Sequence, residues 1–147
     1  MRLKAILLAF LIFIAAAGSA LAERTKKYDL NAILGWAGQA GGIMKSFGYH
    51  LINNYISTEV SIAVFQHSYP FSLNLTLQLP LGPVSPYVSA GYGYSLSGFG
   101  ASNFAAGLKF WVSPNTGLLF DVRRFNYTYL GEKKKTTMFG IGFDYRL

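Results

Sequence analysis

Two histidines are the side chains best suited to chemistry in this sequence, and neither has the partners that catalysis requires. His67 is followed by Ser68, and a serine becomes a nucleophile when a histidine oriented by a carboxylate removes its proton. The nearest acidic residue in the chain is Glu59, eight positions earlier. Neither His67 nor His50 has a second histidine or a cysteine at the spacing of a metal site. We therefore predict no catalytic residue, metal or cofactor, and we interpret His50 as a hydrogen-bonded interior residue.

The composition indicates an exported protein that is poor in charge. Charged residues make up 13% of the 147 residues, about half the share in a soluble domain, and cysteine is absent. Residues 1–22 resemble a cleavable signal peptide, because two basic residues precede an apolar run at 5–17, and small residues, Ala20 and Ala22, follow at a cleavage site. The apolar run is shorter than a membrane-spanning helix of about 20 residues, although an uncleaved anchor is the alternative. Cleavage would leave a domain of residues 23–147, and the loss of two basic residues would lower the net charge from +7 to +5.

Eight segments of this domain alternate between apolar and polar residues, which is the period of a β-strand. The clearest segment is 71–81, where Phe71 and the leucines at odd positions alternate with Ser72, Asn74, Thr76, Gln78 and Pro80. The sequence places the strands at 28–38, 46–52, 55–65, 71–81, 86–96, 102–112, 118–129 and 136–147. We expect turns at 53–54, 82–85 and 113–117 at one end, and loops at 38–45, 66–70, 97–101 and 130–135 at the other.

The second face of these segments decides between a soluble and a membrane protein. In a soluble sandwich or a lipocalin-type barrel, that face would meet water and carry long polar side chains. Here it carries small residues and nearly all of the strand charges, while Arg124 alone breaks the pattern. We therefore predict an all-β, eight-stranded antiparallel up-and-down transmembrane β-barrel whose apolar face contacts lipid. The small residues on the inner face include Ser89, Gly91, Gly93, Ser95, Asn103, Ala105, Gly107, Gly140 and Gly142.

The charged residues of the inner face predict an ion-pair network that closes the lumen. An eight-stranded barrel encloses a space just wide enough for side chains, so we expect a plug and not a pore. A turn symmetric about Asn115 would place Lys109 opposite Asp121, and the following hairpin would place Asp121 beside Asp144. Asp29 is a further charge with the inward phase. The predicted network consists of Glu59, Lys109, Asp121, Arg123, Asp144 and Arg146.

Aromatic residues near strand ends fit the two membrane interfaces. Trp111 has the inward phase beside a turn, where a β-bulge could re-aim it. The interfacial candidates are Tyr28, Trp36, Tyr49, Tyr87, Tyr129 and Tyr145.

Three stretches carry a resemblance to a known family: SPYVSAGYGYS at 85–95, GLKFWVSPNTGLLFDVRRF at 107–125 and GIGFDYRL at 140–147. Over about residues 28–147 the chain resembles the small eight-stranded outer-membrane β-barrels of Gram-negative bacteria, the OmpA/OmpX-like barrel domains. The final pattern of Gly142, Tyr145 and Leu147 is similar to the signal read by the outer-membrane assembly machinery, although family members usually end in Phe or Trp. The resemblance implies an outer-membrane monomer that meets membrane lipid, lipopolysaccharide, periplasmic chaperones and the assembly machinery. The peptidoglycan-binding activity of OmpA belongs to a domain that follows its barrel and does not transfer to these residues.

The resemblance favours a structural barrel without catalytic activity, which contributes to membrane integrity or to surface interactions. Some barrels of this type are lipid A deacylases or acyltransferases that use a histidine, a serine and an acidic residue, so His67 and Ser68 keep a lipid A-modifying enzyme as the first alternative. A narrow solute channel is the second alternative. The basic run of Lys133, Lys134 and Lys135 is either a solvated loop or a contact to lipopolysaccharide phosphates, and an exported barrel does not call for nucleic acid.

Overall fold

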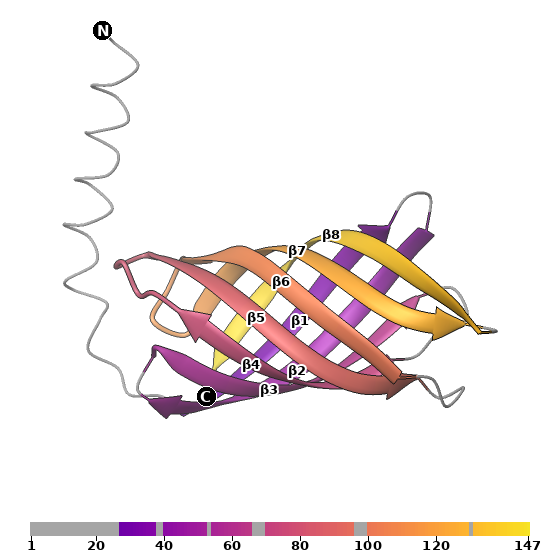
Figure 1. The fold of residues 1–147 in the computed structure, drawn as a ribbon. Helices are drawn as coiled ribbons and strands as arrows, with labels where there is room; N and C mark the ends of the chain where they lie inside the picture. Colours follow the sequence, from indigo (N-terminus) through magenta and orange to yellow (C-terminus); the bar gives the residue numbers. More distant parts are fainter. Residues whose placement is uncertain (1–26, 38–39, 53, 66–69, 96–99, 130) are drawn as a thin grey trace, which may run out of the picture.

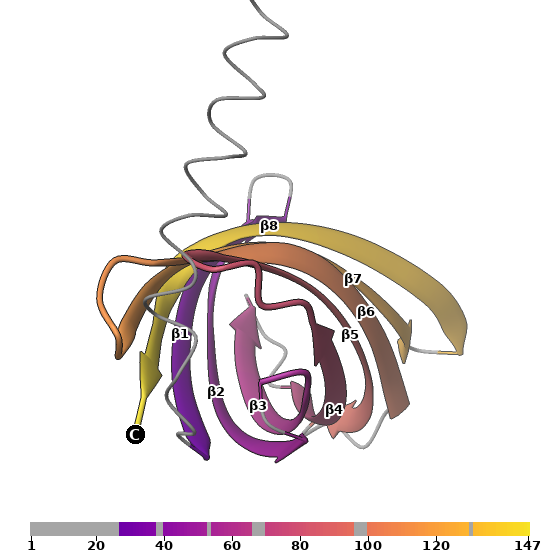
Figure 2. The same ribbon diagram turned by 90° about the vertical axis from the view of Figure 1, so that its left-hand side faces the viewer.

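Eight antiparallel strands form a closed barrel in the computed structural model, which describes residues 27–37, 40–52, 54–65, 70–95, 100–129 and 131–147. Each strand pairs with its neighbours in the chain, and β8 pairs with β1 to close the ring (Figure 1). Figure 2 looks into the end of the barrel at which the C-terminus lies. The predicted up-and-down barrel is confirmed. The strands are β1 (Tyr28–Ala37), β2 (Ala40–Ile52), β3 (Ile56–Phe65), β4 (Pro70–Gln78), β5 (Val84–Ser95), β6 (Gly100–Trp111), β7 (Thr116–Tyr129) and β8 (Glu132–Arg146).

The barrel is inverted, with its apolar side chains on the outside. In β4, Leu73 is 58% exposed, whereas its neighbours Ser72 and Asn74 are buried in the lumen. The same alternation runs through β8, where Phe143 is 62% exposed and Asp144 is completely buried. A continuous apolar wall of this extent is unsuited to water and suited to lipid. In β4, the polar face is therefore the buried one and the apolar face is exposed.

Most described residues of two predicted loops belong to strands in the structure. The glycine-rich segment 38–45 was expected to be a loop, but Ala40 to Lys45 belong to β2. Gly41 and Gly42 pair with Trp36 and Gly35 of β1, so ladder hydrogen bonds overcome the low strand preference of glycine. The strand β4 also ends at Gln78, three residues earlier than predicted.

The predicted loop at 130–135 is also wrong, because β8 begins at Glu132 and includes the three lysines. Gly131 makes this possible, since its φ of +80° suits a tight turn that a side chain would strain. The lysines then pair with Thr128, Tyr127 and Asn126 of β7. Alternation places neighbouring lysines on opposite faces of the strand, which reduces the repulsion that a run of like charges would otherwise create.

The lumen is less uniform than the sequence indicated. Besides charges and small residues, it contains an apolar cluster of large side chains contributed by several strands. Three aromatic residues of the described part are buried inside: Phe125, Trp111, whose inward phase is kept, and Tyr87, which was wrongly expected at a membrane interface. Tyr87 has the opposite phase to Val88 and Tyr92 on the outer wall of β5. The cluster comprises Ile33, Met44, Ala63, Tyr87, Leu119, Phe125 and Met138.

Candidate functional site: the charged interior of the barrel

Lys109 connects three strands of the lumen wall that are not all neighbours in the ring. Its Nζ lies 2.6 Å from Asp144 Oδ2 and 3.7 Å from Asp29 Oδ2, and all three side chains are buried. The lysine comes from β6, whereas the two carboxylates come from β8 and β1, which are not neighbours of β6 in the ring. One buried cation therefore pairs with two anions across the barrel, and it offsets the repulsion between them.

Asp29 is the shared anion of this group. Its carboxylate oxygens lie 2.7 Å from His50 Nε2 and 3.6 Å from Arg146 Nε, and they also pair with Lys109. The Arg146 guanidinium lies 3.6 Å from the ring centroid of Trp111, which is a close cation–π contact. Trp111 in turn donates from Nε1 to Ser85 Oγ at 3.1 Å. These residues fill the lumen at the end where the chain terminates, and we call them the terminal layer: Asp29, His50, Ser85, Lys109, Trp111, Asp144 and Arg146.

A second charged group is centred on Asp121. Its carboxylate accepts hydrogen bonds from Arg123 Nε at 3.1 Å and from the Tyr87 hydroxyl at 2.5 Å. Arg123 also donates from Nη1 to Asn103 Oδ1 at 2.9 Å. Lys109 Nζ lies 5.7 Å from the Tyr87 ring centroid, which connects this group to the terminal layer.

Glu59 is buried near these residues, yet no described ion pair includes it. The structure thus places all six predicted network residues inside the barrel and joins five of them in two groups of ion pairs. Asp29 and His50 belong to the first group and were missing from the predicted network. Their inward phase in β1 and β2 was the signal that could have included them.

The predicted cross-strand partners are wrong by two residues or more. Lys109 lies opposite Leu119 and not opposite Asp121, which faces Gly107. Asp144 lies opposite Gly117. The turn is tighter than assumed, because the backbone N–H groups of Val112 and Ser113 both donate to Thr116 O. A shift by an even number keeps every side chain on its face, so the inward set survives while the pairs change.

A ladder of small polar side chains from β3, β4 and β6 lines another part of the lumen. The Ser61 and Ser72 hydroxyls are 2.7 Å apart, Asn74 Nδ2 donates to Ser61 Oγ at 2.8 Å, and Asn103 Nδ2 donates to Asn74 Oδ1 at 2.8 Å. Through Asn103 the ladder reaches Arg123 and so continues into the second charged group. These hydrogen bonds satisfy buried polar groups where water has little room.

Ser57 brings a nucleophile beside the Asp29–His50 pair, because it is the cross-strand partner of His50. Its hydroxyl is buried and makes no hydrogen bond with any described residue, including His50. A hydrolase needs a base in contact with the nucleophile and an open path for substrate. These three residues therefore do not form the hydrogen-bonded serine–histidine–carboxylate relay of a hydrolase in this structure. The other candidate pair, His67 and Ser68, lies outside the described residues.

The remaining predicted site residues belong to β8 or directly follow it. Tyr145 and Leu147 are exposed, and Leu147 N donates to Tyr28 O at 2.9 Å to complete the last pairing. Gly142 faces inward, where a Cβ would collide with the backbone of Ala32 and Ile33. Lys133 and Lys135 share the outward phase of Ile141 and Phe143, whereas Lys134 has the opposite phase.

The described residues contain no cluster of three or more histidine, cysteine or acidic side chains that could hold a metal ion. Among the described residues, no helix is long and apolar enough to cross a membrane.

Comparisons with known proteins identify the fold. No family model and no curated protein matches the sequence. A de novo designed transmembrane β-barrel superimposes with a TM-score of 0.71 at 16% identity, covering 86% of this chain and 99% of the design. The N-terminal β-barrel domain of Pseudomonas aeruginosa OprF gives 0.62 at 19% identity, with 82% and 98% covered. The outer-membrane enzyme PagL gives 0.56 at 16% identity, with 81% and 99% covered. The chain therefore has the fold of the small eight-stranded outer-membrane β-barrels.

Proposed function

We propose that the protein is a structural barrel of a Gram-negative outer membrane, without catalytic activity and without an open channel. The observation that carries this proposal is the combination of an apolar outer wall with a lumen filled by ion pairs, hydrogen bonds and an apolar cluster. A water-filled channel would need a polar lumen with free space, whereas here Lys109 and Trp111 extend into the interior. Such a barrel contributes to the integrity of the membrane or presents its outer end to partners.

The direct test measures conductance and location together. Purified, refolded protein in planar bilayers should give no steady conductance, and the native protein should fractionate with the outer membrane. A stable open state would replace the structural role with a narrow solute channel. Recovery in another fraction would reject the location independently of the lumen.

We further propose that residues 1–22 are removed during export and that the mature barrel acts as a monomer. Periplasmic chaperones and the outer-membrane assembly machinery would deliver it, with Gly142, Tyr145 and Leu147 as the terminal recognition pattern. The exposed positions of Tyr145 and Leu147 support this role, since a receptor can read side chains on the outer wall.

The fold is shared with an outer-membrane enzyme, PagL, so an enzyme stays the second candidate. The family resemblance of the sequence suggests lipid A as its substrate. Its test is a mass spectrum of lipid A from cells with and without the protein. Loss or gain of an acyl chain that depends on His67 and Ser68 would establish the enzyme, and identical spectra would reject it.

A further inference from the structure

Three cations form a patch on the outer wall at one end of the barrel. Arg124 of β7 is exposed, with the same outward phase as Phe120 and Val122. Lys135 and Lys133 of β8 are also exposed and have the outward phase of Ile141. Arg124 pairs with Thr137, the next outward residue along β8 from Lys135, so the two cations are diagonal neighbours. We call Arg124, Lys133 and Lys135 the β7–β8 basic patch.

The patch lies at the end of the barrel away from the C-terminus, where the β7–β8 hairpin turns (Figure 1). No described carboxylate lies within ion-pairing distance of its three cations. Cations on a lipid-facing wall are costly unless they reach the interface, where anionic headgroups attract them. An anionic partner at the membrane surface therefore complements the patch.

A groove lies in the wall directly below the patch. Val122 and Phe139 form the pair next to Arg124 and Thr137, and Phe120 and Ile141 form the following one. Ala106 lies opposite Val122, and its small side chain leaves a hollow between larger neighbours. The groove has a volume of about 370 Å³ and is lined mainly by apolar residues, among them Leu108, Phe120, Val122, Phe139 and Ile141.

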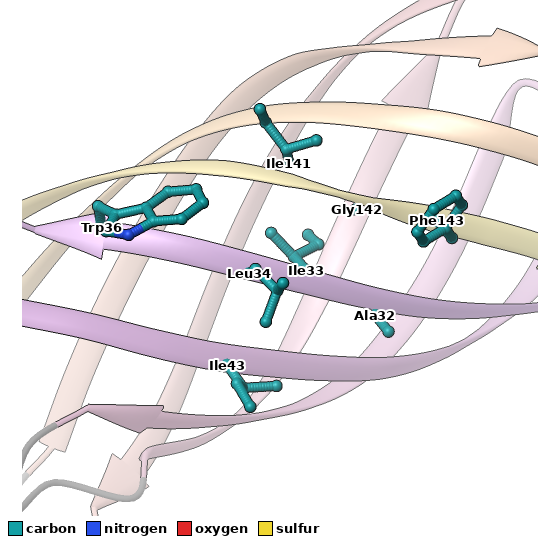
Figure 3. Close-up of a pocket in the computed structure, with 8 residues that line it drawn as sticks. All are labelled: Ala32, Ile33, Leu34, Trp36, Ile43, Ile141, Gly142 and Phe143. Carbon is teal, nitrogen blue, oxygen red and sulfur yellow. The ribbon is translucent and has the colours of Figure 1, made fainter.

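A second groove lies on the other side of β8, in the wall formed with β1 and β2 (Figure 3). It has a volume of about 380 Å³, and the small outward side chain of Ala32 leaves space between Ile141, Phe143 and Ile43. Trp36 and Ile141 line both grooves, so the two hollows meet along β8. Together they offer room for more than one hydrocarbon chain below a single cationic patch.

We propose that the β7–β8 basic patch and the two grooves bind lipid A, a phosphorylated amphiphile with several acyl chains, as a specific annular lipid. The patch pairs with the phosphates, and the grooves hold acyl chains against the wall. This inference rests on the proposed outer-membrane location, because the termini of an even-stranded barrel lie in the periplasm and the hairpin end then meets the outer leaflet. It extends the proposed function by naming the lipid and the residues that select it.

The number of cations favours lipid A over a phospholipid. Three cations in one patch match a headgroup with more than one phosphate, whereas one basic side chain is enough for a phosphodiester. The two adjoining grooves can hold acyl chains of either lipid, so the phosphates decide the selection. The site therefore commits to lipid A, and an ordinary anionic phospholipid serves as the competing ligand in the test.

The test uses the refolded, lipid-free barrel in detergent and native mass spectrometry with three lipids: bisphosphorylated lipid A, its dephosphorylated form and phosphatidylglycerol. The wild-type protein should retain bisphosphorylated lipid A most strongly. Each cation near a membrane surface contributes about 1 kcal/mol, so each change of Arg124, Lys133 or Lys135 to Gln should weaken lipid A binding about fivefold. The triple variant should lose on the order of a hundredfold.

Two further variants distinguish binding of lipid A at this specific site from non-specific electrostatic attraction to the protein. Lys134→Gln removes the same charge from the same strand but on the opposite face, so it should change binding less than twofold. Ala106→Phe fills the groove from the exposed outer wall and should weaken lipid A binding severalfold while the cations remain. Loss of the fast-migrating folded gel band would show that a Gln variant does not fold. In that case the variants that keep the charge, Lys135→Arg and Arg124→Lys, must fold and bind lipid A as the wild type does.

Three outcomes would overturn the inference: phosphatidylglycerol bound as tightly as lipid A, Lys134→Gln as damaging as Lys135→Gln, or Ala106→Phe without effect. None of these outcomes bears on the proposed closed lumen, which the conductance measurement tests separately.

Discussion

At the scale of single residues, Lys109 has the most demanding position in the barrel. It is buried among Asp144, Asp29 and Tyr87, and it separates two carboxylates that would otherwise repel each other. Burying a charge is tolerable only when it is paired, and removing one partner leaves the others uncompensated. The terminal layer is therefore stabilising as a set, and each member depends on the rest.

Lys109→Met should destabilise the barrel more than any change on its outer wall. The lysine is replaced by an apolar chain of similar size, so Asp144 loses its described ion-pair partner, while Asp29 keeps His50 and Arg146. The loss amounts to about 3–5 kcal/mol, less if water enters the lumen. The temperature at which the folded, fast-migrating gel band disappears should fall clearly. Arg124→Ala, on the exposed wall, is the control and should leave that temperature nearly unchanged.

Asp121→Ala tests the second charged group in the same way. It removes the acceptor of both Arg123 and Tyr87, so a buried guanidinium loses its carboxylate. We expect a lower unfolding temperature, again with Arg124→Ala as the comparison. An Asp121→Ala barrel as resistant to heat as the wild type would show that Arg123 does not depend on this ion pair.

Variants at Gly142 distinguish a role in packing from a role in recognition by the assembly machinery. A Cβ at this position would meet the backbone of Ala32 and Ile33, whereas a Cβ at Gly41 would meet nothing within 4 Å. Overpacking of this kind costs about 1–3 kcal/mol. Gly142→Ala should therefore lower the yield and heat resistance of protein refolded in detergent, where no assembly machinery is present, while Gly41→Ala should not. A defect confined to cells would assign Gly142 to recognition alone.

At the scale of elements, strand phase could be predicted from the sequence, whereas register and loop lengths could not. Alternation of period two fixes which residues of a strand face the lumen, so the inward phase of Lys109, Asp121 and Arg123 was visible in advance. Their partners depend on hydrogen bonds within the turn at Ser113, which no pattern of hydrophobicity reports. The lengths of the hairpins that contain β2 and β8 were also not predicted, because the first residues of these strands are glycines or lysines, which are typical of loops.

The tight turn at Gly131 should control the β7–β8 hairpin. Its positive φ strains any L-residue, and Asn tolerates this region better than Ala. Gly131→Ala should cost about 1–2 kcal/mol locally, and Gly131→Asn should cost less. Hydrogen exchange at the amides of Lys133 and Lys135 would measure the effect, since the hairpin can fray without unfolding the barrel. Equal exchange rates in both variants and in the wild type would show that the turn at Gly131 does not control the stability of the hairpin.

At the scale of the whole molecule, the two faces of the wall have exchanged the roles they have in a soluble barrel. Large apolar residues cover the outside, while the lumen combines ion pairs, a polar ladder and an apolar cluster. The apolar cluster was not apparent from the sequence, because the inward positions of Ile33, Met44 and Met138 are scattered over three strands and meet only when the barrel closes. A closed wall without disulfides then depends on strand pairing and on this filled interior.

Export determines which part of the chain reaches the membrane as a barrel. The pattern of residues 1–22 predicts cleavage after Ala22, because signal peptidases require small residues at the positions that Ala20 and Ala22 occupy. The intact mass of the protein from outer membranes should therefore correspond to a chain that begins at Glu23. Ala22→Arg should block cleavage and leave the precursor in the inner-membrane fraction, whereas Ala17→Leu, within the apolar run, should not. A mature protein that retains residues 1–22 would show that this segment is an anchor, and would reject cleavage while leaving the barrel itself in place.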